Sequence, residues 1–183
     1  MLVSITEKFK YLTIVKYLQL LMEDVFVSFV SPLSPRQRVV WSLLSRGFSV
    51  SHVAERLKTS RQFVNQTRQM AEAKLSKSLM DVAQANNLQI KGFYPEKAML
   101  LGYHPALGRE AVVTYTVSHG IKVWYWHDNP EEVTDEGFLR KTRDYLLDIA
   151  QERGIELTEE EKEVHPGRLA HIIFSKLIPE LRT

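Results

Sequence analysis

Three serines, Ser34, Ser49 and Ser60, each stand directly before a stretch whose apolar residues repeat at helical spacing. Serine is a preferred N-cap, because its hydroxyl oxygen accepts a hydrogen bond from a free backbone N–H in the first helical turn. The links between the three predicted helices have room only for tight turns, so the helices must pack directly against one another. The sequence therefore predicts a compact all-α unit over residues 32–87.

The first two predicted helices have well-marked ends. In the first, Pro35 occupies the first helical position, Gln37 completes a capping box with Ser34, and Gly47 supplies a left-handed cap. The second helix is only about two turns long. Its buried side includes the small Ala54, which lets another helix cross it closely.

The third predicted helix is long, because neither glycine nor proline occurs between Arg61 and Leu88. An apolar seam continues along it through Ala71, Leu75, Leu79 and Val82. This seam suits pairing with the same helix of a second subunit, and packing against an N-terminal helix of the same chain would use it equally well.

One face of the third helix consists of carboxamides at positions i, i+3, i+4 and i+7: Gln62, Asn65, Gln66 and Gln69. A carboxamide presents a donor and an acceptor side by side, which matches N6 and N7 of adenine, whereas arginine reaches guanine or phosphate. In a helix-turn-helix layout this helix lies in the major groove of DNA. The predicted DNA-binding residues are Arg36, Lys58, Ser60, Arg61, Gln62, Asn65, Gln66, Arg68 and Gln69.

The segment from Leu33 to Leu75 resembles the helix-turn-helix shared by LuxR-type regulators and the fourth region of bacterial sigma factors, and it is similar to the archaeal Tfx-like regulators. The matching pieces are Leu33-Ser34-Pro35-Arg36-Gln37, Gly47-Phe48-Ser49, Val53-Ala54-Glu55-Arg56-Leu57 and Ser60-Arg61-Gln62-Phe63-Val64. The resemblance implies a cytoplasmic transcription regulator that binds double-stranded DNA as a homodimer and is not an enzyme.

Two residues depart from the pattern of these families. Lys58 stands where a turn glycine is usual, so either this residue adopts a left-handed conformation or the turn differs. His52 replaces the common glutamate of a capping box. Neither change removes a predicted DNA contact.

Charge is distributed unevenly along the chain. Residues 32–82 hold nine lysines and arginines against three acidic residues, a surplus of +6, whereas residues 83–183 hold twelve against sixteen, a deficit of −4. A basic module joined to an acidic one is typical of a nucleic-acid-binding unit that carries a separate ligand or partner domain.

Residues 88–183 change to a strand-like pattern with helices at the end. A β-hairpin is predicted from residues 111–117 and 121–127, and residues 98–103 are expected to pair with it. Helices are predicted near residues 134–153, after a capping box of Thr158 with Glu161, and around Leu169 to Leu177. The fold class is therefore α+β, in which an N-terminal helix-turn-helix is joined by a long helix to a small α+β domain for dimerisation, sensing of a small-molecule effector, or both.

Residues 1–31 are apolar but repeatedly interrupted by charges, so an amphipathic helix is expected there, docked on the body or on a second subunit. No membrane span is predicted. The absence of cysteine excludes disulfides and thiolate metal sites.

A catalytic site, a metal site and a cofactor are not predicted. The histidines of the second half share no motif with carboxylates at ligand spacing: His104, His119, His127, His165 and His171. Two alternatives remain open. The first is an enzyme or ligand-binding protein whose site joins two of His104, His119 and His127 to Glu110 or Asp128. The second is a protein-docking adaptor, in which the carboxamide face is buried against the rest of the chain.

Overall fold

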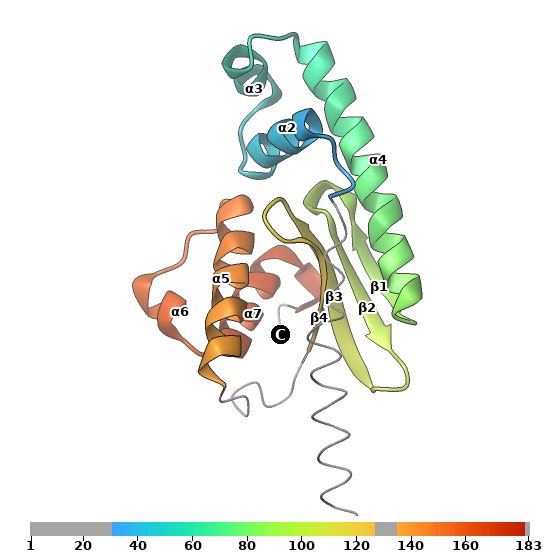
Figure 1. The fold of residues 1–183 in the computed structure, drawn as a ribbon, viewed down its shortest axis with the longest axis vertical. Helices are drawn as coiled ribbons and strands as arrows, with labels where there is room; N and C mark the ends of the chain where they lie inside the picture. The colour runs from blue at the N-terminus through green and yellow to red at the C-terminus, as the bar shows by residue number, and fades with distance from the viewer. Residues whose placement is uncertain (1–30, 127–134, 182–183) are drawn as a thin grey trace, which may run out of the picture.

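The structure is a computed structural model, and it describes residues 31–126 and 135–181. These ranges form a mixed α+β fold with six α-helices and one four-stranded antiparallel sheet (Figure 1), which confirms the α+β part of the prediction. The helices are α2 (Pro35–Ser45), α3 (Val50–Arg56), α4 (Arg61–Ala85), α5 (Glu136–Glu152), α6 (Glu159–Glu163) and α7 (Pro166–Leu177). The strands are β1 (Gln89–Tyr94), β2 (Met99–His104), β3 (Arg109–Thr116) and β4 (Gly120–Tyr125). Short 3-10 turns span Pro95–Lys97 and Pro179–Leu181. No helix in these ranges is long and apolar enough to cross a membrane.

The three predicted serine caps are all present. The Ser34 hydroxyl accepts from the backbone N–H of Gln37, whose side chain accepts from the Ser34 N–H, so the capping box is complete. Ser49 and Ser60 cap α3 and α4 with the same acceptor bond from the hydroxyl oxygen, but neither helix has the reciprocal side-chain bond. Gly47 has φ +90°, as the predicted left-handed cap requires.

Helices α2, α3 and the first half of α4 form a three-helix head. Its own core is small, with Val40, Val53, Ala54 and Val64 buried together. The three residues Lys58 to Ser60 make the turn into α4, and Lys58 adopts φ +49°. Of the two possibilities raised by the missing glycine, the chain therefore takes the left-handed one.

The long third helix is confirmed as a single helix of 25 residues. Within the described residues, its apolar seam packs on the sheet, a contact that the sequence did not predict. Leu75 and Leu79 are fully buried against the sheet residues Leu100 and Val113. The sheet therefore covers the seam within the same chain, because a half-buried antiparallel sheet needs a helix on its face.

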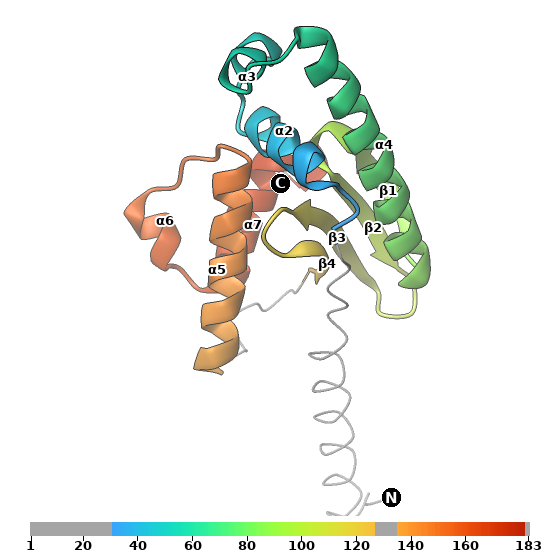
Figure 2. The same cartoon turned by 45° about the horizontal axis from the view of Figure 1, so that its top comes forward.

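The sheet is a meander in the order β1-β2-β3-β4, with α4 on one face and α5 and α7 on the other (Figures 1 and 2). Side chains alternate between the two faces along each strand. On β4, Tyr125 packs on the α4 side, whereas Trp124 and Trp126 pack on the side of α5 and α7. The two tryptophans and the tyrosine therefore lie on opposite faces of the sheet.

The predicted hairpin and its third strand are confirmed as β3, β4 and β2, and the predicted helices as α5, α6 and α7. The capping box of Thr158 and Glu161 is present, but the helix that it starts has only five residues. Strand β1 is an element that the sequence did not predict.

Head and body share one core across the predicted boundary between residues 87 and 88. Leu33 and Trp41 belong to the same buried cluster as the sheet residues on the α4 face. The Ser31 hydroxyl is hydrogen-bonded to that of Tyr115 on β3 at 2.8 Å. The loop after α5 also contacts the head, since a Cβ at Gly154 would stand 3.3 Å from the carbonyl oxygen of Arg46. The predicted N-terminal helix of residues 1–31 lies outside the described residues, apart from Ser31.

Candidate nucleic-acid interface

The first turns of α4 stand clear of the sheet at one end of the molecule (Figures 1 and 2). The four carboxamides there, which we call the carboxamide row, are Gln62, Asn65, Gln66 and Gln69. The three glutamines are exposed and Asn65 is half-buried. None of the four side chains has a hydrogen-bond partner in the described part of the chain. The row lies opposite the buried Val64, Thr67 and Ala71, so it faces away from the head's core.

Two arginines border the carboxamide row on one side. At 100° per residue, Arg61 and Arg68 fall on the same flank of α4. Arg61 is exposed, whereas Arg68 is half-buried and its Nε lies 3.7 Å from the Glu72 carboxylate. Arg68 is therefore partly engaged within the helix, and Arg61 is the more accessible cation of the two.

The opposite flank is bordered by Arg36 of α2. Its guanidinium lies 4.5 Å from the ring centroid of Phe63, a cation–π contact that joins the first turns of α2 and α4. The side chain is exposed and forms no ion pair with the described residues. Arg36 is thus held in place while its charge stays open to solvent.

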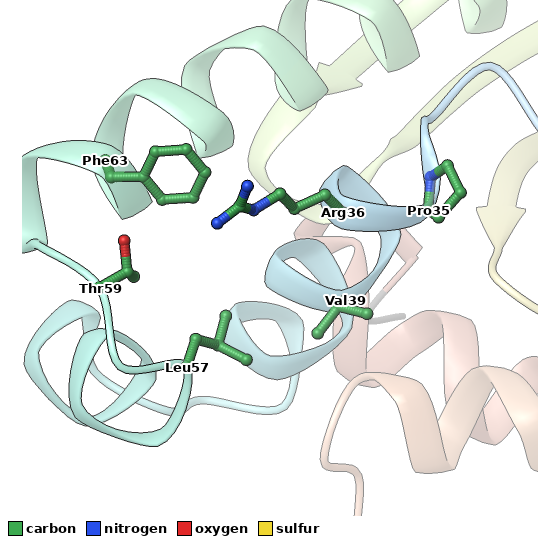
Figure 3. A pocket seen from close by; sticks show the side chains of 6 residues that line it. All are labelled: Pro35, Arg36, Val39, Leu57, Thr59 and Phe63. Carbon is green, nitrogen blue, oxygen red and sulfur yellow. The ribbon is translucent and has the colours of Figure 1, made fainter.

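A shallow groove of about 330 Å³ separates the start of α2 from the turn into α4 (Figure 3). Figure 3 shows Arg36 and Phe63 reaching toward each other across it. The groove is lined by Pro35, Arg36, Val39, Leu57, Thr59 and Phe63. Its lining is mainly apolar, and the Arg36 guanidinium is its only charged group.

The turn between α3 and α4 presents the two other predicted contact residues. Lys58 and Ser60 are both exposed. The Ser60 hydroxyl accepts from the Phe63 N–H at 3.1 Å, so it is used as the N-cap of α4. The structure thus brings all nine predicted residues to one end of the head, with Arg68 and Ser60 engaged in contacts inside α4.

Two of the three histidines considered for an enzyme site, His104 and His119, do not come together in the described residues. His104 ends β2 beside the start of β3, whereas His119 lies in the turn after β3, at the opposite end of the sheet. Glu110 is paired with Lys91 at 2.6 Å. No group of three metal-binding side chains occurs within residues 31–126 and 135–181. His127 and Asp128 lie outside these ranges.

Two polar contacts in the body were not predicted. His119 Nε2 lies 2.8 Å from the Asp148 carboxylate on α5, and the His119 ring stacks edge-on against Tyr145. The buried Glu152 carboxylate accepts the backbone N–H of Val117 at 2.9 Å. Both contacts tie α5 to the β3–β4 turn, and about thirty residues of sequence separate the partners, so no local pattern signalled them.

The buried Arg153 fixes the same end of the sheet. Its guanidinium donates to the backbone oxygens of Tyr115 and Lys97 and lies 3.6 Å from the Glu152 carboxylate. Nearby, burial lowers the pKa of Lys122 and raises that of Tyr145. The contacts of Glu152 and Arg153 join α5 to the sheet. None of the contacts named here places an accessible nucleophile beside a base.

Comparisons of the chain with protein-family models, with curated proteins and with solved structures find no match. What the head binds must therefore be inferred from its own residues. In the described part of the chain, the amide groups of the carboxamide row have no hydrogen-bond partner, and Arg61 and Arg36 lie on either side of the row.

Proposed function

We propose that the protein is a transcription regulator that binds double-stranded DNA, with the carboxamide row of α4 in the major groove. The observation that carries the proposal is that all four carboxamides lie on a projecting helix and have no partner in the described chain. Amides that pair with nothing in the protein are available for the edges of base pairs. The resemblance of residues 33–75 to known helix-turn-helix domains points the same way.

The cations on the two flanks of α4 suit the two strands that border a major groove. Arg61 stands on one flank and Arg36 on the other, with Lys58 in the turn between α3 and α4. Contacts from such residues to phosphate supply affinity and fix the register, whereas the amides supply sequence preference. The positive surplus of residues 32–82 supports the same division of roles.

We also propose that the body acts as the dimerisation or effector part of the regulator, in the cytoplasm. Since the seam of α4 is already covered by the sheet, a two-fold contact has to use another surface of the body. A dimeric reader needs its two recognition helices about one DNA turn apart. In this arrangement the body, and not the head, sets that spacing.

The two alternatives have less support. A docking adaptor was expected to bury the carboxamide row against its own chain, and the three glutamines of that row are exposed. An enzyme was expected to join two histidines to an acidic residue in one pocket, and His104 and His119 lie at opposite ends of the sheet.

The test is fluorescence anisotropy of the full chain with a labelled random-sequence duplex at several salt concentrations. The logarithm of affinity should fall linearly with the logarithm of salt, with a slope of about 0.9 per phosphate contact. The variant Arg61→Ala with Gln62→Ala should bind more weakly, and its slope should drop by about one contact.

A matched control changes one cationic residue and one glutamine on α5, where Lys141 and Gln151 are exposed. Lys141→Ala with Gln151→Ala removes one charge and one carboxamide, and it should bind as the parent chain does. If both double variants lose the same DNA affinity, only the net charge of the protein matters for binding. That result would contradict a DNA-contacting surface on α4. Absence of binding at low salt would refute the proposed function.

A further inference from the structure

We infer that the half-site read by α4 holds three A·T pairs within a window of about four base pairs, recognised through N6 and N7 of adenine by Gln62, Gln66 and Gln69. This inference rests on the proposed function and specifies its partner. It follows from the composition of the reading face, from its length and from the position of the arginines.

The reading face holds a single kind of polar group. Every residue of the carboxamide row ends in an amide, and no charged side chain lies between them. An amide meets adenine with both groups satisfied, because its oxygen accepts from N6 and its nitrogen donates to N7. Opposite guanine, O6 and N7 are both acceptors, so the amide oxygen would remain unpaired.

The length of the row sets the number of base pairs. Gln62 and Gln69 are seven residues apart, which corresponds to about 10 Å along a helix that rises 1.5 Å per residue. Base pairs in B-DNA are about 3.4 Å apart along each strand. The row therefore spans about three base-pair steps, which is a window of about four base pairs. The three glutamines are exposed and long, whereas Asn65 is half-buried and shorter.

The arginines that could read guanine lie off this face. Arg68 is on the flank and engaged with Glu72, and Arg61 lies on the same flank at the start of α4. Arg36 is held beside Phe63 on the other side. The three are placed for phosphate, so a guanine preference within the half-site is not expected.

The test starts from a duplex pool randomised over its central positions, from which the full chain selects its preferred sequences. The selected half-site should contain three A·T pairs within about four neighbouring positions. Adenines in it are then replaced one at a time by 7-deazaadenine, which lacks the N7 acceptor but still pairs with thymine. Each replacement at a contacted adenine should weaken binding about tenfold.

A double cycle assigns each glutamine to a base. Gln62→Ala, Gln66→Ala and Gln69→Ala are each measured on the parent duplex and on each 7-deazaadenine duplex. If a glutamine contacts a given adenine, replacing that adenine by 7-deazaadenine should cause almost no further loss of affinity in the variant that lacks this glutamine. The matched control is Gln84→Ala, which changes an exposed glutamine near the other end of α4. It should leave the loss of affinity caused by each base change as it is in the parent chain. Replacing adenine by 2,6-diaminopurine alters only the minor groove, and it should have little effect.

The outcomes separate this inference from the proposed function. Selection of G·C pairs at the centre, or equal binding of all sequences, would overturn the adenine reading while DNA binding itself stands. A strong effect of diaminopurine without an effect of 7-deazaadenine would place recognition in the minor groove and would also overturn it. If no duplex binds, the proposed function fails as well.

Discussion

Replacement of Leu79 by alanine tests whether head and body share one core. Leu79 is fully buried in the cluster that contains Trp41 of α2 and Leu100 and Val113 of the sheet. A leucine-to-alanine change at such a position costs about 2–5 kcal/mol, because apolar contact is lost and a cavity remains. We expect about 3 kcal/mol here, since the surrounding residues come from three elements that cannot all move inward.

The assay is urea unfolding followed by two probes that report on different parts of the chain. Tryptophan fluorescence of a background with Trp124→Phe and Trp126→Phe follows Trp41 alone, and far-ultraviolet circular dichroism follows all helices and strands. With a slope of about 2–3 kcal/mol per molar urea, the midpoint should fall by about 1 M or slightly more. Both probes should shift by the same amount, because Leu79 supports both parts.

The result that would refute this reasoning is a Trp41 midpoint that stays in place while the circular dichroism midpoint falls. The head would then fold independently of the sheet. The control is Leu107→Ala, the same substitution at a residue that is 52% exposed. It should change stability by less than about 0.5 kcal/mol.

Three further predictions concern charge and backbone strain. Glu152→Gln should destabilise the fold by about 3 kcal/mol, because it leaves the buried guanidinium of Arg153 without its counter-charge; an unchanged urea midpoint would show that the guanidinium is compensated elsewhere. Lys58→Gly should raise the Tm by a few degrees, since glycine adopts φ +49° without strain, and a lower Tm in calorimetry would contradict this. Burial and the hydrogen bond to Glu180 raise the pKa of Tyr94 to about 12, so a phenolate titration compared with Tyr94→Phe should place its ionisation there. Because the unfolded chain releases this proton near pH 10, the contribution of Tyr94 to the free energy of unfolding should fall between about pH 10 and 12. If the difference in unfolding free energy between the parent and Tyr94→Phe stays constant over that range, the prediction is wrong.

The head was predictable because its signals are local. Ser34, Ser49 and Ser60 each cap a helix with a hydrogen bond to a residue three positions later, so neighbouring sequence determines them. The carboxamide row follows from helical periodicity alone. Its exposure depends only on α4 projecting beyond the sheet.

Strand β1 escaped prediction for an equally physical reason. It is an edge strand whose pairing with β2 is interrupted by a register shift between Ile90 and Gly92. The shift breaks the alternation of apolar and polar residues that signals a strand, and Ile90 and Phe93 are left exposed on the α4 side. A glycine within the segment weakens the signal further.

The flanks of the interface needed the tertiary fold. Arg36 is 27 residues from Phe63 in sequence, and only the packing of α2 across α4 brings its guanidinium over the ring. The engagement of Arg68 with Glu72 is local, since the two residues are four positions apart on α4. Sequence patterns therefore named the candidate residues, and the structure adds where each of them lies on the head.

The use of α4 by two parts of the molecule constrains how the proposed regulator could work. Its first turns carry the carboxamide row, and its later turns carry Leu75 and Leu79 in the core of the body. A helix of 25 residues without glycine or proline transmits rotation from one end to the other with little bending. The head is fixed at a second place, where Gly154 after α5 meets the carbonyl oxygen of Arg46. A ligand or partner that displaces the sheet against α5 would therefore have to reorient the reading face or break this contact, so regulation through the body would act on head orientation and not on the folding of the head.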